Sequence, residues 1–212
     1  MAARASPVKG LARVALFVLS ALCFGSLGTS YAVPLDRVDI GALAPAFSAK
    51  GADGRQYRLH DYAGKLVVLE WTSPVCPFTA AKYKSGAMQA LQHYAASHNI
   101  IWLSINTAAP NRAGYLTAAQ ARARITQTGA TVSGFLFDVD GSIARRYGAK
   151  TTPSFFIVDR EGKLAYEGAM DDDIFDNTGK GHDYIQPALE DLLSNRPVRD
   201  AQTQPQGCAI EY

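Results

Sequence analysis

The central apolar run of this chain covers residues 66–71 and predicts a strand buried on both faces. The run ends at Ser73-Pro74, where proline disfavours helix at the residue before it. Apolar positions then follow loose helical spacing over residues 77–97, and proline is tolerated in the first turn of a helix. Cys76 therefore lies where a buried strand gives way to the N-terminus of a helix.

Further strands and helices alternate along the chain. A turn signal at Asp53-Gly54 predicts a hairpin before the central strand, and Thr117 with Gln120 predicts a capping box at the start of a helix. The predicted strands cover residues 47–50, 56–59, 100–105, 135–138, 154–159 and 164–167, and later helices begin at residue 117 or cover residues 142–147 and 184–193. This order predicts an α/β fold, with a central mixed sheet flanked by helices and an N-terminal β extension. Its chemistry is expected at the carboxyl end of the central strand.

The N-terminus has the pattern of a secretory signal. Residues 1–13 carry three cations and no acid, residues 14–27 are almost wholly apolar, and small residues lead to Ala32. This pattern predicts a signal peptide of residues 1–32, cleavage before Val33 and a periplasmic or equivalent location. An uncleaved anchor is the alternative, and it would be the only contact with a membrane.

Removal of that segment changes the charge. Without its three cations, the formal net charge falls from +2 to about −1, which leaves no basic surface of the kind that binds nucleic acid. About 180 residues remain, enough for one domain. We expect a leader at residues 33–40, a folded domain at 41–195 and a polar strap at 196–212. The acidic residues 171–173 and Asp176 are expected to form a solvated face.

Cysteine usage points to redox chemistry. Loss of Cys23 with the signal leaves Cys76 and Cys208. Unpaired N–H groups and the helix dipole favour an anion at a helix N-terminus, so the pKa of Cys76 should lie below the free-thiol value of about 8.5. A buried structural cysteine is the alternative. The four histidines show no metal-ligand spacing, and no cofactor is expected.

The residues around Cys76 carry a family resemblance. The sequence Cys76-Pro77-Phe78-Thr79 resembles the CxxC motif of thioredoxin-like proteins, with Thr79 in place of the second cysteine. Residues 70–78 are similar to a peroxiredoxin-like group within the alkyl hydroperoxide reductase/thiol-specific antioxidant superfamily, and the likeness extends over about residues 41–212. It implies a thioredoxin-like fold and a thiol oxidoreductase whose nucleophile is Cys76.

Two other features fit this resemblance. Thr151-Thr152-Pro153 resembles the cis-proline loop of thioredoxins, which implies that Pro153 lies beside Cys76 and that Thr152 offers backbone hydrogen bonds to substrate. Glu70 matches the buried acid that relays protons in thioredoxins, so its pKa should be raised and its loss should slow resolution more than the first attack. A solvent-facing Glu70 is the alternative.

The substrate is open at this point. In the peroxidase pattern PxxxTxxC, Ser73 fits the hydroxyl position, but Leu69 replaces the proline and the family's activating arginine aligns with Pro153. Reduction of a hydroperoxide with an external thiol as reductant therefore competes with disulfide exchange with a protein partner. The third class is a non-enzymatic binding protein, although Ala80 removes the second ligand of a CxxxC copper site.

The terminal cysteine is the remaining thiol. We predict a Cys76–Cys208 disulfide in the oxidised protein, because a sulfenic acid needs a second thiol and the hydroxyl of Thr79 cannot supply one. Residues 196–206 could span about 30 Å, and Gly207 would allow close approach of the backbone. The alternative is a Cys208 docked elsewhere, with Cys76 resolved by an external thiol.

Overall fold

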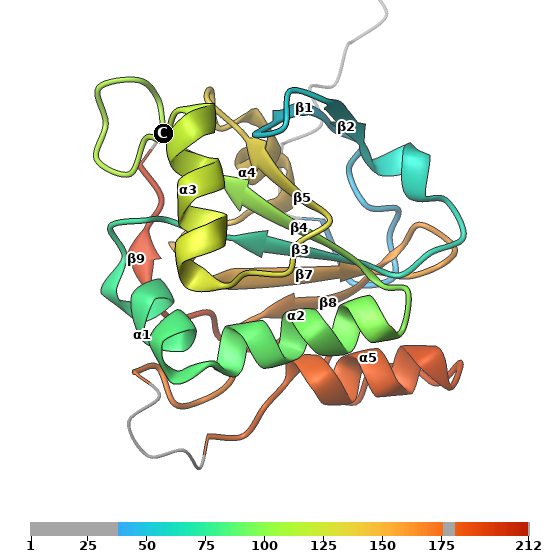
Figure 1. Cartoon of the computed structure of the whole chain (residues 1–212). Coiled ribbons are helices and arrows are strands. Elements are labelled where there is room, and N and C mark those ends of the chain that lie inside the picture. Colours follow the sequence, from blue (N-terminus) through green and yellow to red (C-terminus); the bar gives the residue numbers. More distant parts are fainter. Residues whose placement is uncertain (1–37, 176–180, 212) are drawn as a thin grey trace, which may run out of the picture. The chain divides into compact units, whose positions relative to one another are not determined.

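A seven-stranded mixed sheet is the framework of the protein. The computed structural model describes residues 38–175 and 181–211. The strand order is β2-β1-β5-β4-β3-β7-β8, in which β3–β4 and β4–β5 are parallel pairs and the other pairs are antiparallel (Figure 1). These strands are β1 (Ser48–Gly51), β2 (Gln56–Arg58), β3 (Val67–Trp71), β4 (Ile101–Asn106), β5 (Gly134–Phe137), β7 (Ser154–Val158) and β8 (Leu164–Gly168).

Helices cover both faces of this sheet. Two core clusters lie on opposite faces of β3, because alternate residues of a strand point to opposite sides. Val68 packs with α2 and α5, which lie side by side, and Leu69 packs with α4 (Figure 1). The helical elements are η1 (Leu59–Tyr62), α1 (Pro77–Ser85), α2 (Ala87–Ser97), α3 (Ala118–Thr128), α4 (Ser142–Tyr147) and α5 (Ile185–Leu193). The predicted α/β fold with its N-terminal hairpin is confirmed.

The first predicted helix is divided in two. Residues 77–97 form α1 and α2, separated by Gly86 in the left-handed conformation at φ 89°. Glycine adopts this conformation without the penalty that a Cβ atom imposes, so it ends α1 and allows α2 to start in a new direction. The prediction of one continuous helix was wrong, because apolar spacing does not report a change of helix axis. The capping box at Thr117 and Gln120 is confirmed.

A buried ion pair connects α1 to the loop after β8. Lys82 is 2% exposed, and its Nζ lies 2.8 Å from both carboxylate oxygens of Asp171. It also donates to the backbone oxygen of Asp173. The prediction of a solvated acidic face was therefore wrong for Asp171, because a lysine remote in sequence brings that carboxylate into the structure. Asp176 lies outside the described residues.

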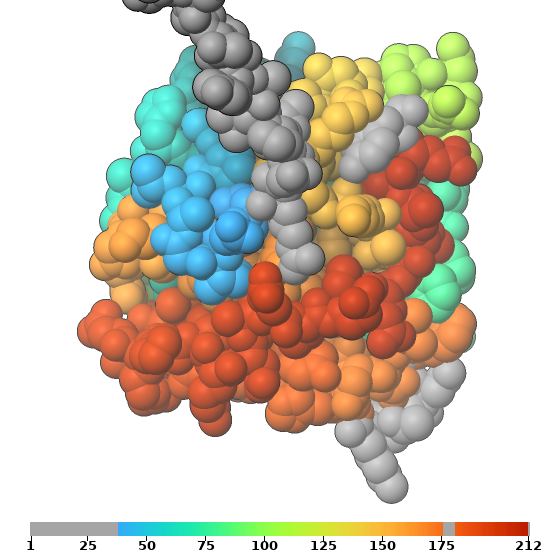
Figure 2. Space-filling view, turned by 180° about the vertical axis from the view of Figure 1, so that it is seen from behind, coloured from blue at the N-terminus to red at the C-terminus, as the bar shows by residue number. Residues whose placement is uncertain are grey.

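The C-terminal strap follows the surface and ends in a short strand. Residues 196–211 run from α5 across the face seen in Figure 2, where the backbone N–H of Glu167 donates to Ala201 and its carbonyl accepts from Thr203. The strap ends in β9 (Cys208–Ala209), which pairs antiparallel with β6 (Thr151–Thr152). The sequence predicted the strap but not this strand pair.

The N-terminal predictions fall largely outside the described region. The proposed signal of residues 1–32 lies there, as do residues 33–37 of the leader. Val38 is buried in the core, and Ile40 packs against the same cluster, so the end of the leader belongs to the folded domain. Within residues 38–175 and 181–211, no helix has the length and apolar character needed to cross a membrane.

A carboxyl group lies inside the sheet. Glu70 on β3 is 0% exposed and accepts hydrogen bonds from Trp102 Nε1 at 2.8 Å and from Ser104 Oγ at 2.7 Å. The Tyr83 hydroxyl and the Gln92 amide lie farther from it, at 3.3 and 3.4 Å. Burial raises the pKa of Glu70, and these donors oppose the rise only in part. The solvent-facing alternative is excluded, and the predicted direction of the shift is confirmed.

Replacement of Glu70 by glutamine should change how stability depends on pH. A raised pKa in the folded state means that the native protein holds a proton that the unfolded chain releases above about pH 4.5. Wild-type stability relative to Glu70→Gln should therefore fall as the pH rises from 4 to 8, by about 1.4 kcal/mol for each unit of raised pKa. Urea unfolding of both proteins across this range measures the effect. A constant difference, or one that grows with pH, would contradict it.

Candidate active site

Cys76 occupies the N-cap position of α1. Its backbone is extended (φ −82°, ψ 118°), Pro77 is the first helical residue, and the carbonyl of Cys76 accepts the first helical hydrogen bond from Ala80 at 3.0 Å. The side chain of an N-cap residue faces the unpaired N–H groups of the first turn. Cys76 is only 1% exposed, so its sulfur reacts in a site closed by other parts of the chain.

The cis-proline loop forms one wall of this site. The Thr152–Pro153 peptide bond is cis, as the sequence predicted. The Cys76 thiol donates a hydrogen bond to the backbone oxygen of Thr152 at 2.9 Å. One sulfur–carbonyl contact thus joins Cys76 to Thr152, a residue remote in sequence, at the end of the sheet.

Cys208 forms the opposite wall. In the β6–β9 pair, Thr152 lies directly across from Cys208, and the Cys208 thiol hydrogen-bonds to Cys76. Both cysteines are free thiols in this structure. The approach depends on Gly207, because a Cβ atom at this position would lie 2.0 Å from the backbone oxygen of Thr152. The predicted approach of the C-terminus to Cys76 is therefore present, and the disulfide itself stays a prediction.

Several donors make Cys76 the more acidic thiol. Burial alone would raise the pKa of Cys76, but the Cys208 thiol, the Thr152 hydroxyl and the Thr79 backbone N–H outweigh it and lower the pKa below the ordinary thiol value, because each can donate a hydrogen bond to the thiolate. The predicted direction is confirmed. The main cause differs from the one expected, because Cys208 and Thr152 act more strongly than the helix N-terminus that Thr79 represents.

The pKa of the Cys208 thiol shifts in the opposite direction. Burial, together with the hydrogen bond and charge interaction with Cys76, raises the pKa of Cys208 to about 12. Two thiols in contact share their titration, because ionisation of one disfavours ionisation of the other. The first proton therefore leaves from Cys76, and Cys208 keeps its own as a donor to the thiolate.

The remaining predicted site residues are Thr79, Ser73 and Glu70. Thr79 contributes its backbone N–H to Cys76, a contact that any residue other than proline would provide. The backbone oxygen of Ser73 accepts from the Cys76 N–H at 3.4 Å, and its Oγ faces Gly114, where a Cβ atom would come within 3.0 Å. Glu70 is buried in its own network beneath the site. Sequence reasoning assigned Thr152 only a backbone role and missed its hydroxyl.

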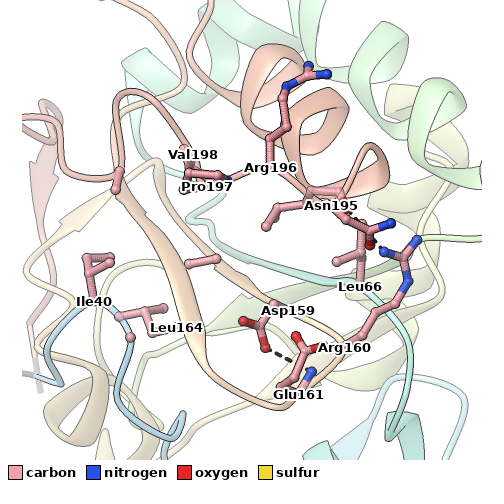
Figure 3. A pocket seen from close by; sticks show the side chains of 14 residues that line it. Ile40, Leu66, Asp159, Arg160, Glu161, Leu164, Asn195, Arg196, Pro197 and Val198 are labelled. Atoms are coloured by element: carbon pink, nitrogen blue, oxygen red, sulfur yellow. Dashed lines mark hydrogen bonds between the residues drawn. The ribbon is translucent and has the colours of Figure 1, made fainter.

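The cavity drawn in Figure 3 does not include these residues. A cavity of about 380 Å³ is formed by the β7–β8 turn, the end of α5 and the start of the strap (Figure 3). The side chain of Arg160 at its edge already donates to the Leu192 carbonyl at 3.1 Å. Within the described part of the chain, no cluster of three or more His, Cys, Asp or Glu side chains could hold a metal ion.

Solved structures show the same fold. An uncharacterized conserved protein from Geobacillus kaustophilus has 26% sequence identity and a TM-score of 0.74, with 84% of this chain and 94% of that chain covered. A hypothetical protein from Sinorhizobium meliloti 1021 has 25% identity and a TM-score of 0.72, with coverages of 84% and 96%. The thioredoxin domain of a thiol-disulfide oxidoreductase from Bacteroides vulgatus has 16% identity and a TM-score of 0.51, with coverages of 68% and 97%, which shows the fold alone. The predicted thioredoxin-like fold is confirmed.

Sequence comparison identifies the family. No curated protein matches the chain. Residues 40–167 match the model of the AhpC/TSA family, and this segment contains Cys76 and the cis-proline loop. The family match and the thioredoxin-like fold together support a thiol-dependent redox activity. Because the match covers more than half of the sequence, this chain belongs to the AhpC/TSA family.

Proposed function

We propose that the protein reduces a hydroperoxide, with Cys76 as the nucleophile and Cys208 as the resolving thiol. The observation that carries this proposal is the β6–β9 pair, which sets Cys208 across from Thr152, the residue whose backbone oxygen accepts from the Cys76 thiol. The lowered pKa of Cys76 and the raised pKa of Cys208 support the two roles. A thiolate is the reactive form of cysteine, and a second thiol in contact converts its oxidised form into a reversible disulfide.

The first step oxidises Cys76. Its thiolate attacks one oxygen of the hydroperoxide, a sulfur–oxygen bond forms, and the oxygen–oxygen bond breaks. The other oxygen takes the electron pair and a proton and leaves as an alcohol or as water. Cys76 is then a sulfenic acid, and the hydroperoxide has been reduced by two electrons.

The second step consumes the sulfenic acid. The Cys208 thiolate attacks the Cys76 sulfur, a sulfur–sulfur bond forms and the sulfur–oxygen bond breaks. The oxygen takes the proton that Cys208 released and leaves as water. Part of the raised pKa of Cys208 comes from its contact with the Cys76 sulfur. Once Cys76 carries oxygen and no negative charge, that part is lost, so Cys208 ionises more readily when its thiolate is needed. An external thiol then reduces the disulfide and restores both cysteines.

The arrangement of β9 favours a small substrate. In thioredoxins, to which the cis-proline loop is similar, the residue matching Thr152 offers its backbone to a protein substrate. In this protein β9 already pairs with that residue, and Cys76 is 1% exposed. A hydroperoxide needs only a small opening of the strap, whereas a protein substrate would have to displace β9.

Disulfide exchange with a protein partner is the second candidate. The specific observation in its favour is the contact of Cys76 with the thioredoxin-like loop at Thr152, with Pro153 in the place of the peroxidase arginine. In this reaction the Cys76 thiolate attacks a partner disulfide, and one partner sulfur leaves as a thiolate. Cys208 then attacks the mixed disulfide and releases the partner.

We also propose that the protein acts after export. The pattern of residues 1–32 supports this location, as does a two-cysteine site suited to an oxidising compartment. Mass spectrometry of exported protein should give an N-terminus at Val33. Exported protein that begins at Met1 or Ala2 would contradict the predicted cleavage.

Substitution of Gly207 should open the site. In Gly207→Ala the new Cβ would collide with the Thr152 backbone oxygen, so β9 should separate from β6. Alkylation of Cys76, followed by peptide mass spectrometry, should accelerate about tenfold if the closed strap loses about 1.4 kcal/mol. Gly64→Ala is the matched control, because Gly64 also has a positive φ of 80° but no atom near a new Cβ. Equal rates in the two variants would contradict gating by the strap.

Stopped-flow oxidation distinguishes the two candidate reactions. Reduced protein lacking residues 1–32 is mixed with hydrogen peroxide or with an aromatic disulfide, and the change in tryptophan fluorescence is followed. We expect oxidation by peroxide that is fast in wild type and absent in Cys76→Ser. Fast reaction with the disulfide alone would instead support disulfide exchange, and no Cys76-dependent reaction with either would overturn both enzyme proposals.

The oxidised product tests the role of Cys208. Peptide mapping after one equivalent of peroxide should recover a Cys76–Cys208 disulfide from wild type. Cys208→Ser should stop at the sulfenic acid of Cys76 and proceed to the sulfinic acid with excess peroxide. A wild-type product with oxidised Cys76 and free Cys208 would show that Cys208 does not resolve it.

A further inference from the structure

The side chain of Thr152 carries a hydroxyl that the fold itself does not use. Thr152 is 4% exposed, and its Oγ1 has no hydrogen-bond partner within the part of the chain that the structure describes. A buried hydroxyl without a partner costs about 1–3 kcal/mol, so such a group calls for an explanation. Apolar valine has nearly the same shape and would fill this position without that cost.

The unpaired hydroxyl lies beside the reacting sulfur. The backbone oxygen of Thr152 is 2.9 Å from Cys76 Sγ, and the hydroxyl is close enough to the sulfur to lower its pKa. While Cys76 is a thiol, the sulfur donates to the carbonyl and the hydroxyl is left without an acceptor. A thiolate, or an oxygen atom next to it, would supply the missing acceptor.

Hydroperoxide reduction needs a donor at this place. As the oxygen–oxygen bond breaks, negative charge develops on the oxygen that leaves, and a fixed donor in a closed site stabilises that charge. Pro153 stands where the peroxidase pattern has its arginine, and the Oγ of Ser73 faces Gly114. Thr79 also has an unpaired buried hydroxyl, but its contact with Cys76 is through the backbone N–H. Thr152 is therefore the side chain whose hydroxyl acts directly on the sulfur.

We propose that Thr152 is a catalytic residue whose hydroxyl donates a hydrogen bond to the leaving oxygen of the hydroperoxide. This inference rests on the proposed peroxidase function and deepens it. The sulfur attacks the nearer oxygen, the oxygen–oxygen bond breaks, and the electron pair goes to the outer oxygen, which takes a proton from water. Thr152 holds its own proton throughout and stabilises the charge on that oxygen until it leaves.

The test separates an effect of Thr152 on the leaving oxygen from an effect of Thr152 on the ionisation of Cys76. Thr152→Val removes the donor with little change in shape, and the Cys76 pKa of each variant is measured by thiolate absorbance in a Cys208→Ser background. Peroxide oxidation is then followed at a pH at which Cys76 is fully ionised in every variant. We expect Thr152→Val to react on the order of 100-fold more slowly than its parent there, and Thr152→Ser to restore most of the rate.

The chain offers a matched control in the next residue. Thr151 also has a buried hydroxyl without a partner, but alternation along β6 turns its side chain to the other side of the strand. Thr151→Val should therefore react with peroxide at the parent rate. Reaction with an aromatic disulfide gives a second control, because its leaving group is a stable thiolate that needs no donor, and Thr152→Val should change that rate less than threefold.

The results that would contradict the role of Thr152 differ from the result that would contradict the proposed function. If Thr152→Val reacts with peroxide at the parent rate while Cys76 is fully ionised, Thr152 acts only on the acidity of Cys76. That result would overturn this inference. An equal loss in Thr151→Val, or an equal loss with the disulfide, would indicate a structural disturbance and would overturn it as well. Parent protein that reacts with peroxide no faster than Cys76→Ser would overturn the proposed function itself.

Discussion

The site depends on the pairing of Thr152 with Cys208. This contact between β6 and β9 places the second thiol against Cys76, which is 1% exposed, and covers the cis-proline loop. A two-residue strand pair has little stability alone, so it relies on the rest of the strap, which is anchored by Glu167 and Thr203. Gly207 is the local requirement, because only a residue without a side chain can pass the Thr152 carbonyl at this distance.

Acidity in this site comes from hydrogen bonds to the sulfur. A buried thiolate is unfavourable unless donors compensate the loss of water, and the pKa of Cys76 falls because three parts of the chain supply them. The helix gives one backbone N–H, the cis-proline loop gives a hydroxyl, and the C-terminus gives a thiol. Opening of the strap would remove the last of these, so access to the sulfur and its acidity are coupled through Cys208.

The interior beneath the site is unusually polar for a central strand. Glu70 receives hydrogen bonds from three elements, β4 through Trp102 and Ser104, α1 through Tyr83 and α2 through Gln92. Buried polar groups of this kind are tolerated when each has a partner, and they fix the relative positions of the elements that supply those partners. The buried pair of Lys82 and Asp171 does the same between α1 and the loop after β8, so polar contacts on two sides hold the helix whose N-cap is Cys76.

The sequence determined the order of strands and helices, the position of Cys76 between β3 and α1, the cis-proline loop and the burial of Glu70. These depend on local signals, namely apolar periodicity, turn residues and a motif shared with a family. Such signals come from residues that are close together in the sequence. The break at Gly86, the partner of Lys82 and the strand that contains Cys208 were decided by tertiary structure. The break is a change of helix axis that apolar spacing does not report, whereas the other two depend on which distant segments meet, and a short strand has too few residues to carry a pattern of its own. The orientation of the Thr152 hydroxyl belongs to the same class, because only the fold brings that side chain to the sulfur of Cys76.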